Sequence, residues 1–410
     1  MSFSSADCAR ARRDFPALAR DFDGQPLAFL DSPGGTQVPQ PVIDAIAHGY
    51  RTCNVNVGGA FATSEEVAAA VTAARAAAAD LLGASSPDTI SFGANMTTLN
   101  FALAHALGRR LQPGDEIIVT ALDHEANRGP WLTLAERGAV IREVPLQADG
   151  TLNPEDFARR LNARTRIVAL GLASNALGTV PDVRAVRALC RGTGAVLVCD
   201  AVHYAAHFPV DVAALDCDFL LCSAYKFYGP HVGLLYSRPG LLDALDTDCL
   251  RTQKQTAPYR IETGTLNHPA VMGVTAAVDY LARFGTGDSR RTRLQDAMQA
   301  IGAYEHALAA RYARAVASLR GVRRWGPELA VSPRAPTVSI TLAGHRPESV
   351  ARTLAAAGIQ VWHGHFYALR VLESLDLVAA GGLLRTGFAL YNTDEEVDRL
   401  VASLARLCAA

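Results

Sequence analysis

The chain has 410 residues, of which 50% are hydrophobic and 19% are charged. This length exceeds what one hydrophobic core usually supports, so we expect two lobes with a sizeable buried interior. The formal net charge is -1 and no long run carries a single sign, which argues against nucleic acid or an anionic membrane surface as a partner.

Eight cysteines are scattered along the chain, and none forms a C-x-x-C pair. Several lie in apolar stretches typical of buried strands, so we interpret them as reduced thiols and not as a disulfide framework. The first residues are polar and then rich in arginine, unlike a signal peptide, and we expect a cytoplasmic protein. The alanine-rich stretch that begins at Val67 contains Arg75 and Asp80, so it is too charged to cross a bilayer.

Before residue 110 the sequence predicts helices and two short strands. The first strand leads into a turn with Gly34 and Gly35, where small residues let backbone approach a ligand. The second strand leads into Asn95, Met96 and Thr97 at a helix start, where free amide groups favour a phosphate, although Thr97 could simply cap the helix. We expect a helix and a loose entry segment up to about residue 25, a strand over 27–30, helices over 40–51 and 64–82, a strand over 89–92, and a helix over 97–108.

Five short apolar runs follow, and they are typical of buried parallel strands. Polar side chains come directly after four of them, namely His124, Asn175, Asp200 and Lys226. Open α/β sheets bind ligands at the carboxyl ends of their strands, so these side chains are candidates for one site. The runs span residues 116–120, 139–145, 166–170, 195–199 and 219–222.

An acid and an amine at neighbouring strand ends suit one cofactor, pyridoxal phosphate. It needs a carboxylate that keeps its ring nitrogen protonated and a lysine that holds it as a Schiff base, and Asp200 and Lys226 supply both groups. Ser223 and Tyr225 carry hydroxyl groups suited to a phosphate, and His124 can lie flat on a cofactor ring. Each residue alone is more often a cap or a surface charge, so the prediction rests on the set.

The rest of the chain changes character and predicts a smaller α+β lobe. An antiparallel return strand over 232–236 precedes a polar loop over 262–267 and a helix over 269–284. Short strands then alternate with helices and lack the buried parallel pattern. We expect helical structure over 287–320, 347–357 and 394–408, and strands over 337–342, 359–363 and 383–391.

The ordered set of motifs resembles the class V aminotransferase family, in particular its cysteine desulfurase and selenocysteine lyase branch. The resemblance implies the fold of type I pyridoxal phosphate enzymes, an α/β fold with a mostly parallel seven-stranded sheet and a smaller α+β C-terminal domain. We expect a large cofactor-binding domain over 31–285, a small domain over 286–410, and an N-terminal segment, 1–30, packing with the small domain. The motifs are FLDSPGGTQVP, DHEANRGPW, SNALGTVPDV, VCDAVHYAAH, SAYKFYGP, ETGTLNHPA and LLRTGFALYNTDEEVDRL.

The resemblance also implies residue roles. Lys226 is expected to hold the cofactor and move protons, Asp200 to pair with the pyridine nitrogen, and His124 to stack on the ring. Arg385 is expected to grip the substrate carboxylate with its bidentate fork. Thr265 is expected to reach the phosphate site of a partner subunit, which implies a homodimer. The remaining expected cofactor contacts are Asn175 at the ring hydroxyl and substrate, with Ser223, Asn95, Met96 and Thr97 at the phosphate.

The sequence departs from the family pattern at the loop that carries the nucleophilic cysteine in desulfurases. Tyr367 stands at that position and residues 358–368 contain no thiol, so a persulfide on this loop is doubtful. This is similar to a desulfurase-like subgroup that lacks the catalytic cysteine. His203 replaces a glutamine that contacts the ring hydroxyl, and Tyr225 replaces a histidine beside the lysine. Asn95 and Met96 replace a more polar phosphate-loop pair.

Four histidines invite a comparison with metal ligands. His203 and His207 have helical spacing, and His363 and His365 add two imidazoles. We expect no metal, because His203 can instead hydrogen-bond the cofactor, and His363, His365 and Tyr367 can line the substrate pocket.

The leading hypothesis is a pyridoxal phosphate-dependent lyase acting at Cβ of a small amino acid such as cysteine, cysteine sulfinate or aspartate. An aminotransferase or epimerase with the same cofactor is the alternative. A third hypothesis, from another class, is a cofactor-binding partner in sulfur transfer that turns nothing over. The intact set of Lys226, Asp200 and Arg385 argues against it.

Overall fold

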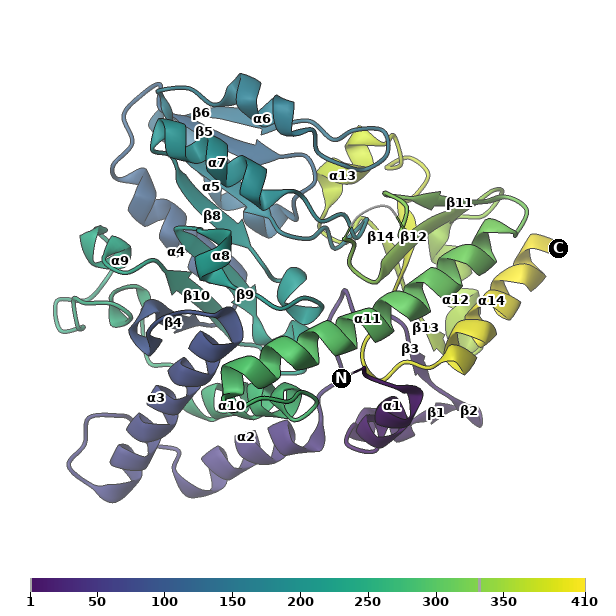
Figure 1. Ribbon diagram of the computed structural model, residues 1–410, viewed down its shortest axis with the longest axis horizontal. Helices are drawn as coiled ribbons and strands as arrows, with labels where there is room; N and C mark the ends of the chain where they lie inside the picture. Colours follow the sequence, from purple (N-terminus) through teal and green to yellow (C-terminus); the bar gives the residue numbers. More distant parts are fainter. Residues whose placement is uncertain (1, 331–332, 410) are drawn as a thin grey trace.

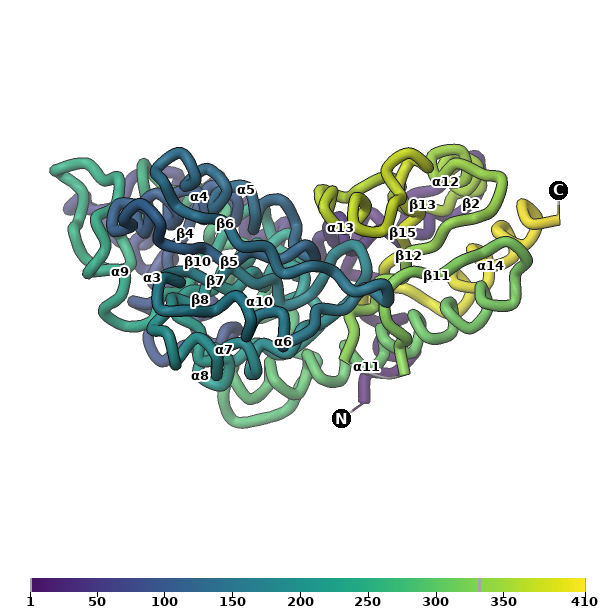
Figure 2. The backbone as a smooth tube through the Cα atoms, turned by 90° about the horizontal axis from the view of Figure 1, so that it is seen from above, coloured from purple at the N-terminus to yellow at the C-terminus, as the bar shows by residue number. Residues whose placement is uncertain are grey.

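The computed structural model describes residues 2–330 and 333–409, which form two lobes that lie side by side (Figures 1 and 2). The large lobe contains a seven-stranded sheet in which β10 is antiparallel to both neighbours and every other pair is parallel. The predicted mostly parallel seven-stranded sheet is therefore confirmed. Across the sheet the strands are β4 (Ile90–Gly93), β10 (Gly233–Ser237), β9 (Phe219–Ser223), β8 (Val196–Asp200), β7 (Thr165–Gly171), β5 (Glu116–Thr120) and β6 (Val140–Val144).

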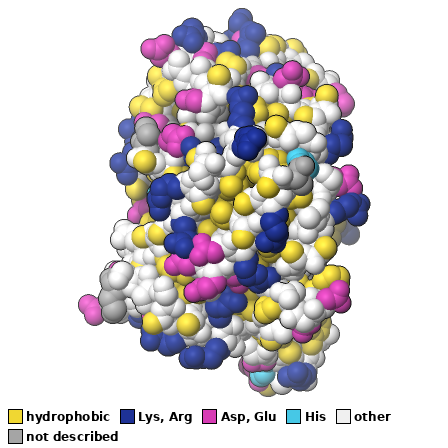
Figure 3. Space-filling view, turned by 90° about the vertical axis from the view of Figure 1, so that its right-hand side faces the viewer, with side chains coloured by type: hydrophobic (Ala, Val, Ile, Leu, Met, Phe, Trp, Pro, Cys, Tyr) yellow, Lys and Arg dark blue, Asp and Glu magenta, His cyan; other side chains and the backbone are white. Residues whose placement is uncertain are grey.

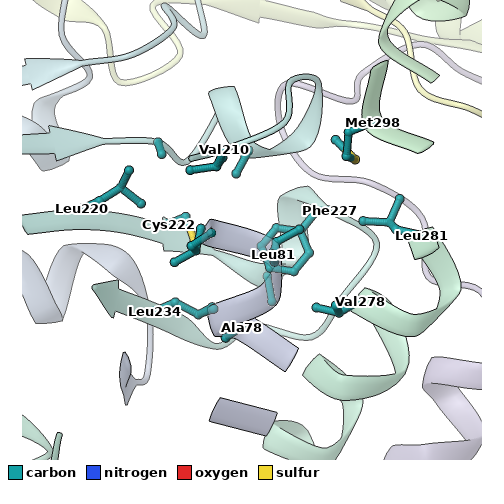
Figure 4. Packing of buried hydrophobic residues seen from close by; sticks show 14 of the residues in the cluster. Ala78, Leu81, Val210, Leu220, Cys222, Phe227, Leu234, Val278, Leu281 and Met298 are labelled. Carbon is teal, nitrogen blue, oxygen red and sulfur yellow. The ribbon is translucent and has the colours of Figure 1, made fainter. Parts of the chain in front are cut away.

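Both faces of this sheet are covered, which explains why its strands are continuously apolar and do not alternate with polar residues. Ile117 and Val119 of β5 point into one hydrophobic cluster, whereas Ile118 points into another. Figure 4 shows the second cluster, where α3, α10 and α11 cover β9 and β10. The first cluster is closed by α4 and α5. The helices of the large lobe are α2 (Gln40–Thr52), α3 (Ala62–Leu82), α4 (Met96–Gly108), α5 (Gly129–Leu132), α6 (Pro154–Arg160), α7 (Val183–Thr193), α8 (Val212–Leu215), α9 (Leu241–Ala244) and α10 (His268–Ala282).

One long helix, α11 (Arg290–Ala317), joins the lobes (Figure 1). It begins with a capping box formed by Ser289 and Thr292. Near its middle, the fully buried Glu305 accepts hydrogen bonds from His207 Nδ1 at 2.7 Å and from the Tyr228 hydroxyl at 3.2 Å. Both donors belong to the large lobe, so α11 is fastened to that lobe well before it reaches the small one.

The small lobe is a four-stranded antiparallel sheet packed against α11, α12 and α14. The N-terminal chain lies against it: β3 (Ala28–Phe29) pairs with β13 (Ile359–Gln360), and Arg12 of α1 (Ser5–Arg12) forms an ion pair with Glu396. Basic and acidic side chains are interspersed on the face shown in Figure 3. The other elements of this lobe are β11 (Val322–Trp325), β12 (Thr337–Leu342), β14 (Trp362–Gly364), β15 (Leu383–Gly387), α12 (Pro347–Ala356), α13 (Leu369–Ser374) and α14 (Asp394–Ala409).

The chain before residue 27 contains α1, which ends at Arg12, followed by the short strands β1 (Asp21–Phe22) and β2 (Gln25–Pro26). Two expectations about elements need correction. The strand expected over 359–363 is divided, because β13 pairs with β3 and β14 pairs with β15. The strand expected over 383–391 ends at Gly387, where the chain passes so close to Pro33 that a Cβ atom would lie 2.1 Å from the proline ring.

Among the described residues no helix is long and apolar enough to span a membrane.

A buried ion pair gives a test of the packing on the large lobe. Arg75 and Glu262 are joined by two hydrogen bonds of 2.7 Å, and Glu262 also accepts one from the Phe92 amide at 2.6 Å. We expect Arg75→Met to lower the free energy of unfolding by about 3–5 kcal/mol, because the Glu262 carboxylate stays buried without its partner. Urea unfolding of the apoprotein measures this loss.

The matched control is Arg352→Met, which removes an exposed ion pair with Glu348. Exposed pairs contribute about 0–1 kcal/mol, so this variant should unfold almost as the parent does. Equal losses in the two variants would contradict the assigned role of Arg75.

Candidate active site

The carboxyl ends of five parallel strands of the large sheet open into one cavity. This edge is where the topology of an open α/β sheet leaves room for a ligand. Ten of the residues expected at the site line the cavity. They are Asn95, Met96, Thr97, His124, Asn175, Asp200, His203, Ser223, Tyr225 and Lys226.

Lys226 and Asp200 face this cavity from neighbouring strand ends. Asp200 is the last residue of β8, and Lys226 lies one helical turn beyond β9. Their side chains are almost completely withdrawn from water, with 7% and 8% of the residue surface exposed. The Asp200 carboxylate accepts the Val202 amide at 2.8 Å, and the Lys226 amine donates to the Pro33 carbonyl.

Burial shifts the pKa values of these two groups in opposite directions, because it favours the neutral form of each. It lowers the pKa of Lys226 to about 7, and the nearby positive charge of Arg385 acts in the same sense. It raises the pKa of Asp200 to about 7, and the neighbouring Asp123 carboxyl adds to the effect. Burial and the charge of Lys226 lower the pKa of His124 to about 4, so its imidazole is neutral at pH 7. A cation beside Asp200 would restore the ionised form of the Asp200 carboxylate, and a protonated pyridine nitrogen is such a cation.

The start of α4 supplies a place for an anion. Asn95 caps this 13-residue helix, because its side chain accepts the Thr98 amide at 2.9 Å. Ser223 Oγ accepts the Met96 amide at 3.0 Å, which brings the end of β9 against the first turn of the helix. A hydroxyl group and the free amides of a helix N-terminus are suited to a phosphate.

Several buried polar atoms at the site have no protein partner within the described residues. Among them are Asn175 Oδ1 and His203 Nδ1, whose residues both line the cavity. Asn175 Nδ2 donates to the Phe366 carbonyl at 2.9 Å, and His203 Nε2 contacts Thr337 Oγ1 at 2.9 Å. Buried polar atoms are normally satisfied, so these two indicate a ligand with its own polar groups. The residues present therefore fit pyridoxal phosphate.

Arg385 lies beside the cavity and not in its lining. Its side chain is buried, donates to the Asn175 carbonyl at 3.2 Å, and has an unpartnered Nε atom. Burial raises the pKa of Asp31 to about 6, and the charges of Arg385 and Lys226 partly oppose this rise. A buried arginine with a free donor beside the cavity is suited to a substrate carboxylate.

Four predicted residues lie apart from the cavity lining. Tyr367 is 69% exposed, although its ring centroid is 5.7 Å from that of His124. His363 and His365 are exposed on the loop that precedes it. Thr265 is also exposed and lies at other surface hollows, so it does not reach the cavity of its own chain.

The sequence reasoning missed Asp123, which lines the cavity. Its carboxylate accepts hydrogen bonds from Thr120 Oγ1, Asn127 Nδ2 and the Gly171 amide, and burial raises its pKa to about 6. The one available signal was its position between a strand end and His124. No group of three or more histidine, cysteine, aspartate or glutamate residues suited to a metal occurs within residues 2–330 and 333–409.

Comparisons with known proteins agree with this geometry. Residues 28–400 match the family described as Aminotransferase class-V. The chain is 36% identical to a cysteine desulfurase from Serratia proteamaculans, with 97% of each chain covered. Its fold is similar to that of the cysteine desulfurase CsdA from Escherichia coli, with a TM-score of 0.85 and 31% identity over 97% of this chain and 98% of that one. The apo cysteine desulfurase from Thermococcus onnurineus NA1 gives a TM-score of 0.88 and 27% identity over 98% of both chains.

The chain belongs to the class-V aminotransferase family. Members of this family use pyridoxal 5'-phosphate, and this protein is a pyridoxal phosphate-dependent enzyme.

The lowered pKa of Lys226 predicts how the cofactor is taken up. The neutral amine is the reactive form, so the uptake rate of the apoprotein should rise through pH 7 and level off above about pH 8. The growth of visible absorbance after mixing with pyridoxal phosphate measures this rate. A rate that still climbs near pH 10 would contradict a depressed pKa.

The composition supplies an internal control for this experiment. The chain has two lysines, Lys226 and the exposed Lys254, against 37 arginines. Borohydride reduction followed by peptide mapping should place the cofactor on Lys226 and leave Lys254 unmodified.

Proposed function

We propose that this enzyme is a cysteine desulfurase-like lyase that cleaves a bond at Cβ of a small α-amino acid such as cysteine, cysteine sulfinate or aspartate. The observation that carries the proposal is the placement of Lys226 and Asp200 in one cavity, with Arg385 beside it. The similarity to named cysteine desulfurases over nearly the whole chain supports this reaction class.

When bound, pyridoxal phosphate supplies an electron sink for negative charge that develops at the substrate Cα. Lys226 anchors the cofactor and, with a pKa near 7, is suited to remove the Cα proton. Asp200 holds the proton on the ring nitrogen, and the neutral imidazole of His124 provides a flat face for the ring. Arg385 binds the α-carboxylate and so orients the substrate.

The proposal includes membership of a subgroup without the catalytic cysteine. No thiol occurs in residues 358–368, and no cysteine lines the cavity among the described residues. Cys222 is fully buried, and burial raises the pKa of its thiol, which makes a reactive thiolate unfavourable. We therefore propose that a sulfur leaving group is released directly and is not stored as a persulfide on this loop. All eight cysteines are unpaired, which favours a reducing compartment such as the cytoplasm.

A panel of amino acids distinguishes the lyase from the alternatives. From cysteine, the lyase should release sulfide with pyruvate and ammonia, because expulsion of sulfide from Cβ leaves an enamine that water hydrolyses. From cysteine sulfinate it should release sulfite with alanine, and from aspartate carbon dioxide with alanine, each product being scored separately. Exchange of amino and keto acids alone would identify an aminotransferase, and change of configuration alone an epimerase. Cofactor binding without any product would favour the non-catalytic partner.

The Lys226→Ala variant should lose the visible absorption band of the bound cofactor and all turnover, because the other lysine of the chain, Lys254, is exposed. Absorbance spectra of the purified variant and product analysis measure both effects. An unchanged band in this variant would overturn the assignment of Lys226.

We also propose a homodimer in which Thr265 of each subunit serves the phosphate site of the other. Thr265 is exposed and does not reach the cavity of its own chain. Large apolar side chains on the same lobe are exposed to solvent, and contact with a second copy of the chain would bury them. They are Ile43, Tyr50, Val57, Phe61, Phe101 and Leu250.

Mixed dimers test this arrangement. Thr265→Ala should weaken cofactor affinity in its homodimer, and Lys226→Ala should abolish attachment in its own. A dimer with one subunit of each kind should regain one normal site, because the subunit with Lys226 then receives an intact Thr265. Titration of purified mixed dimers with pyridoxal phosphate measures the affinity, and failure to regain a normal site would show that Thr265 acts within its own chain. Unchanged affinity in the Thr265→Ala homodimer would show that Thr265 has no part in the site.

A further inference from the structure

The loop that stands in place of the cysteine loop, residues 363–368, is held against the large lobe by two backbone contacts. The Phe366 carbonyl accepts a hydrogen bond from Asn175 Nδ2 at 2.9 Å. The Tyr367 carbonyl accepts one from the Glu125 amide at 2.7 Å. Asn175 lines the cavity and Glu125 directly follows His124, which also lines it, so this loop packs against residues of the site.

The same loop fixes two groups expected to touch cofactor and substrate. Because Asn175 Nδ2 is occupied by the Phe366 carbonyl, Asn175 Oδ1 is left as the acceptor without a protein partner. The guanidinium of Arg385 lies 4.2 Å from the centroid of the Phe366 ring, a cation–π contact in a buried setting. One residue therefore holds both Asn175 and Arg385.

Phe366 needs support to do this, because the loop backbone is unfavourable by itself. Phe366 and Tyr367 have φ values of 54° and 56°, in the left-handed region that side chains with a Cβ atom disfavour. The Phe366 ring is buried in a cluster that includes Leu122 and Leu177 of the large lobe. Such a conformation persists only where surrounding contacts determine it.

An ion-pair clamp supplies further support just after the loop. Arg370 of α13 contacts both oxygens of Glu143 on β6, at 2.8 to 3.0 Å. Glu143 also pairs with Arg128 at 2.9 Å, and Arg128 in turn donates to the Thr120 carbonyl at the end of β5 at 2.6 Å. The clamp thus joins the small lobe to the strand end that precedes His124.

We propose that Phe366 is a positioning residue that orients Asn175 toward the cofactor and Arg385 toward the substrate carboxylate, and that the Glu143–Arg370 clamp holds it in place. The loop contains no thiol, and its proposed part is to orient the two side chains. The inference deepens the proposed function and rests on it for the role of Arg385. It concerns how the site is held and not which bond breaks.

The test compares Phe366→Leu, which keeps an apolar side chain, with the parent holoenzyme. Loss of the cation–π contact should weaken binding of a small unreactive carboxylate, propionate, by about threefold to thirtyfold. Perturbation of the cofactor spectrum on titration measures this affinity. For a turned-over amino acid, KM should rise by a similar factor while kcat changes less, because Arg385 binds the ground state and the transition state alike.

The clamp is tested separately with Glu143→Gln and Arg370→Met. Each should speed hydrogen exchange in peptides covering 121–128 and 362–368, because the Glu125 amide loses its fixed partner on the loop. The double variant should add little to Glu143→Gln, because that substitution already removes the ion pair between Glu143 and Arg370. Asp398→Asn, which removes an exposed ion pair with Arg311, is the matched control and should leave exchange and propionate affinity unchanged.

Different measurements test the positioning role of Phe366 and the lyase activity. Normal propionate affinity in Phe366→Leu, or normal exchange in both clamp variants, would overturn the positioning role even if the enzyme is a lyase. Absence of turnover on every amino acid would overturn the proposed function, while exchange and propionate titration would still decide the role of the loop. If Glu143→Gln does not fold, the partly exposed Arg370→Met carries the same prediction.

Discussion

The site depends on the removal of two unlike charges from water at one edge of a sheet. Asp200 and Lys226 are each more than nine-tenths buried, and neither has a protein partner of opposite charge close enough to form an ion pair within the described residues. Desolvation brings both pKa values to about 7, so the amine is partly neutral and the carboxyl partly protonated. Burying both groups costs folding free energy. A ligand that places a cation beside Asp200 and forms a bond with Lys226 offsets that free-energy cost.

The residues around Asp200 and Lys226 add further polar groups for the same ligand. Asn175 and His203 each use one side-chain atom on the protein and leave the other unpartnered beside the cavity. The first turn of α4 adds amide groups at the opposite end. A neutral His124 lines the same cavity, and a buried Arg385 with the aromatic loop that contacts it lies beside the cavity. The fold supplies rigid strand ends, and the chemistry is assembled from the residues that follow them.

Much of this arrangement could be predicted from the sequence, because short apolar runs followed by polar residues identify parallel strands and their ligand-binding edge. Asp200, Lys226 and His124 were found in this way. Asp123 was not assigned a role, since a single acidic residue in a turn has no periodic signal. The part played by Phe366 could not be predicted either, because it follows from two left-handed backbone conformations and from contacts with residues distant in sequence. The division of the strand expected over 359–363 likewise depends on pairing with β3, more than three hundred residues earlier.

The attachment of Glu305 to His207 and Tyr228 has a mechanical consequence. Because α11 is held near its centre, it cannot slide along its axis unless these hydrogen bonds break. Breaking them would leave the fully buried Glu305 carboxylate without a partner. Any rocking of the small lobe must therefore flex the last turns of α11, leaving the half beside the large sheet at rest. Because Tyr228 lies two residues after Lys226, its hydrogen bond to Glu305 also holds the segment that carries the lysine.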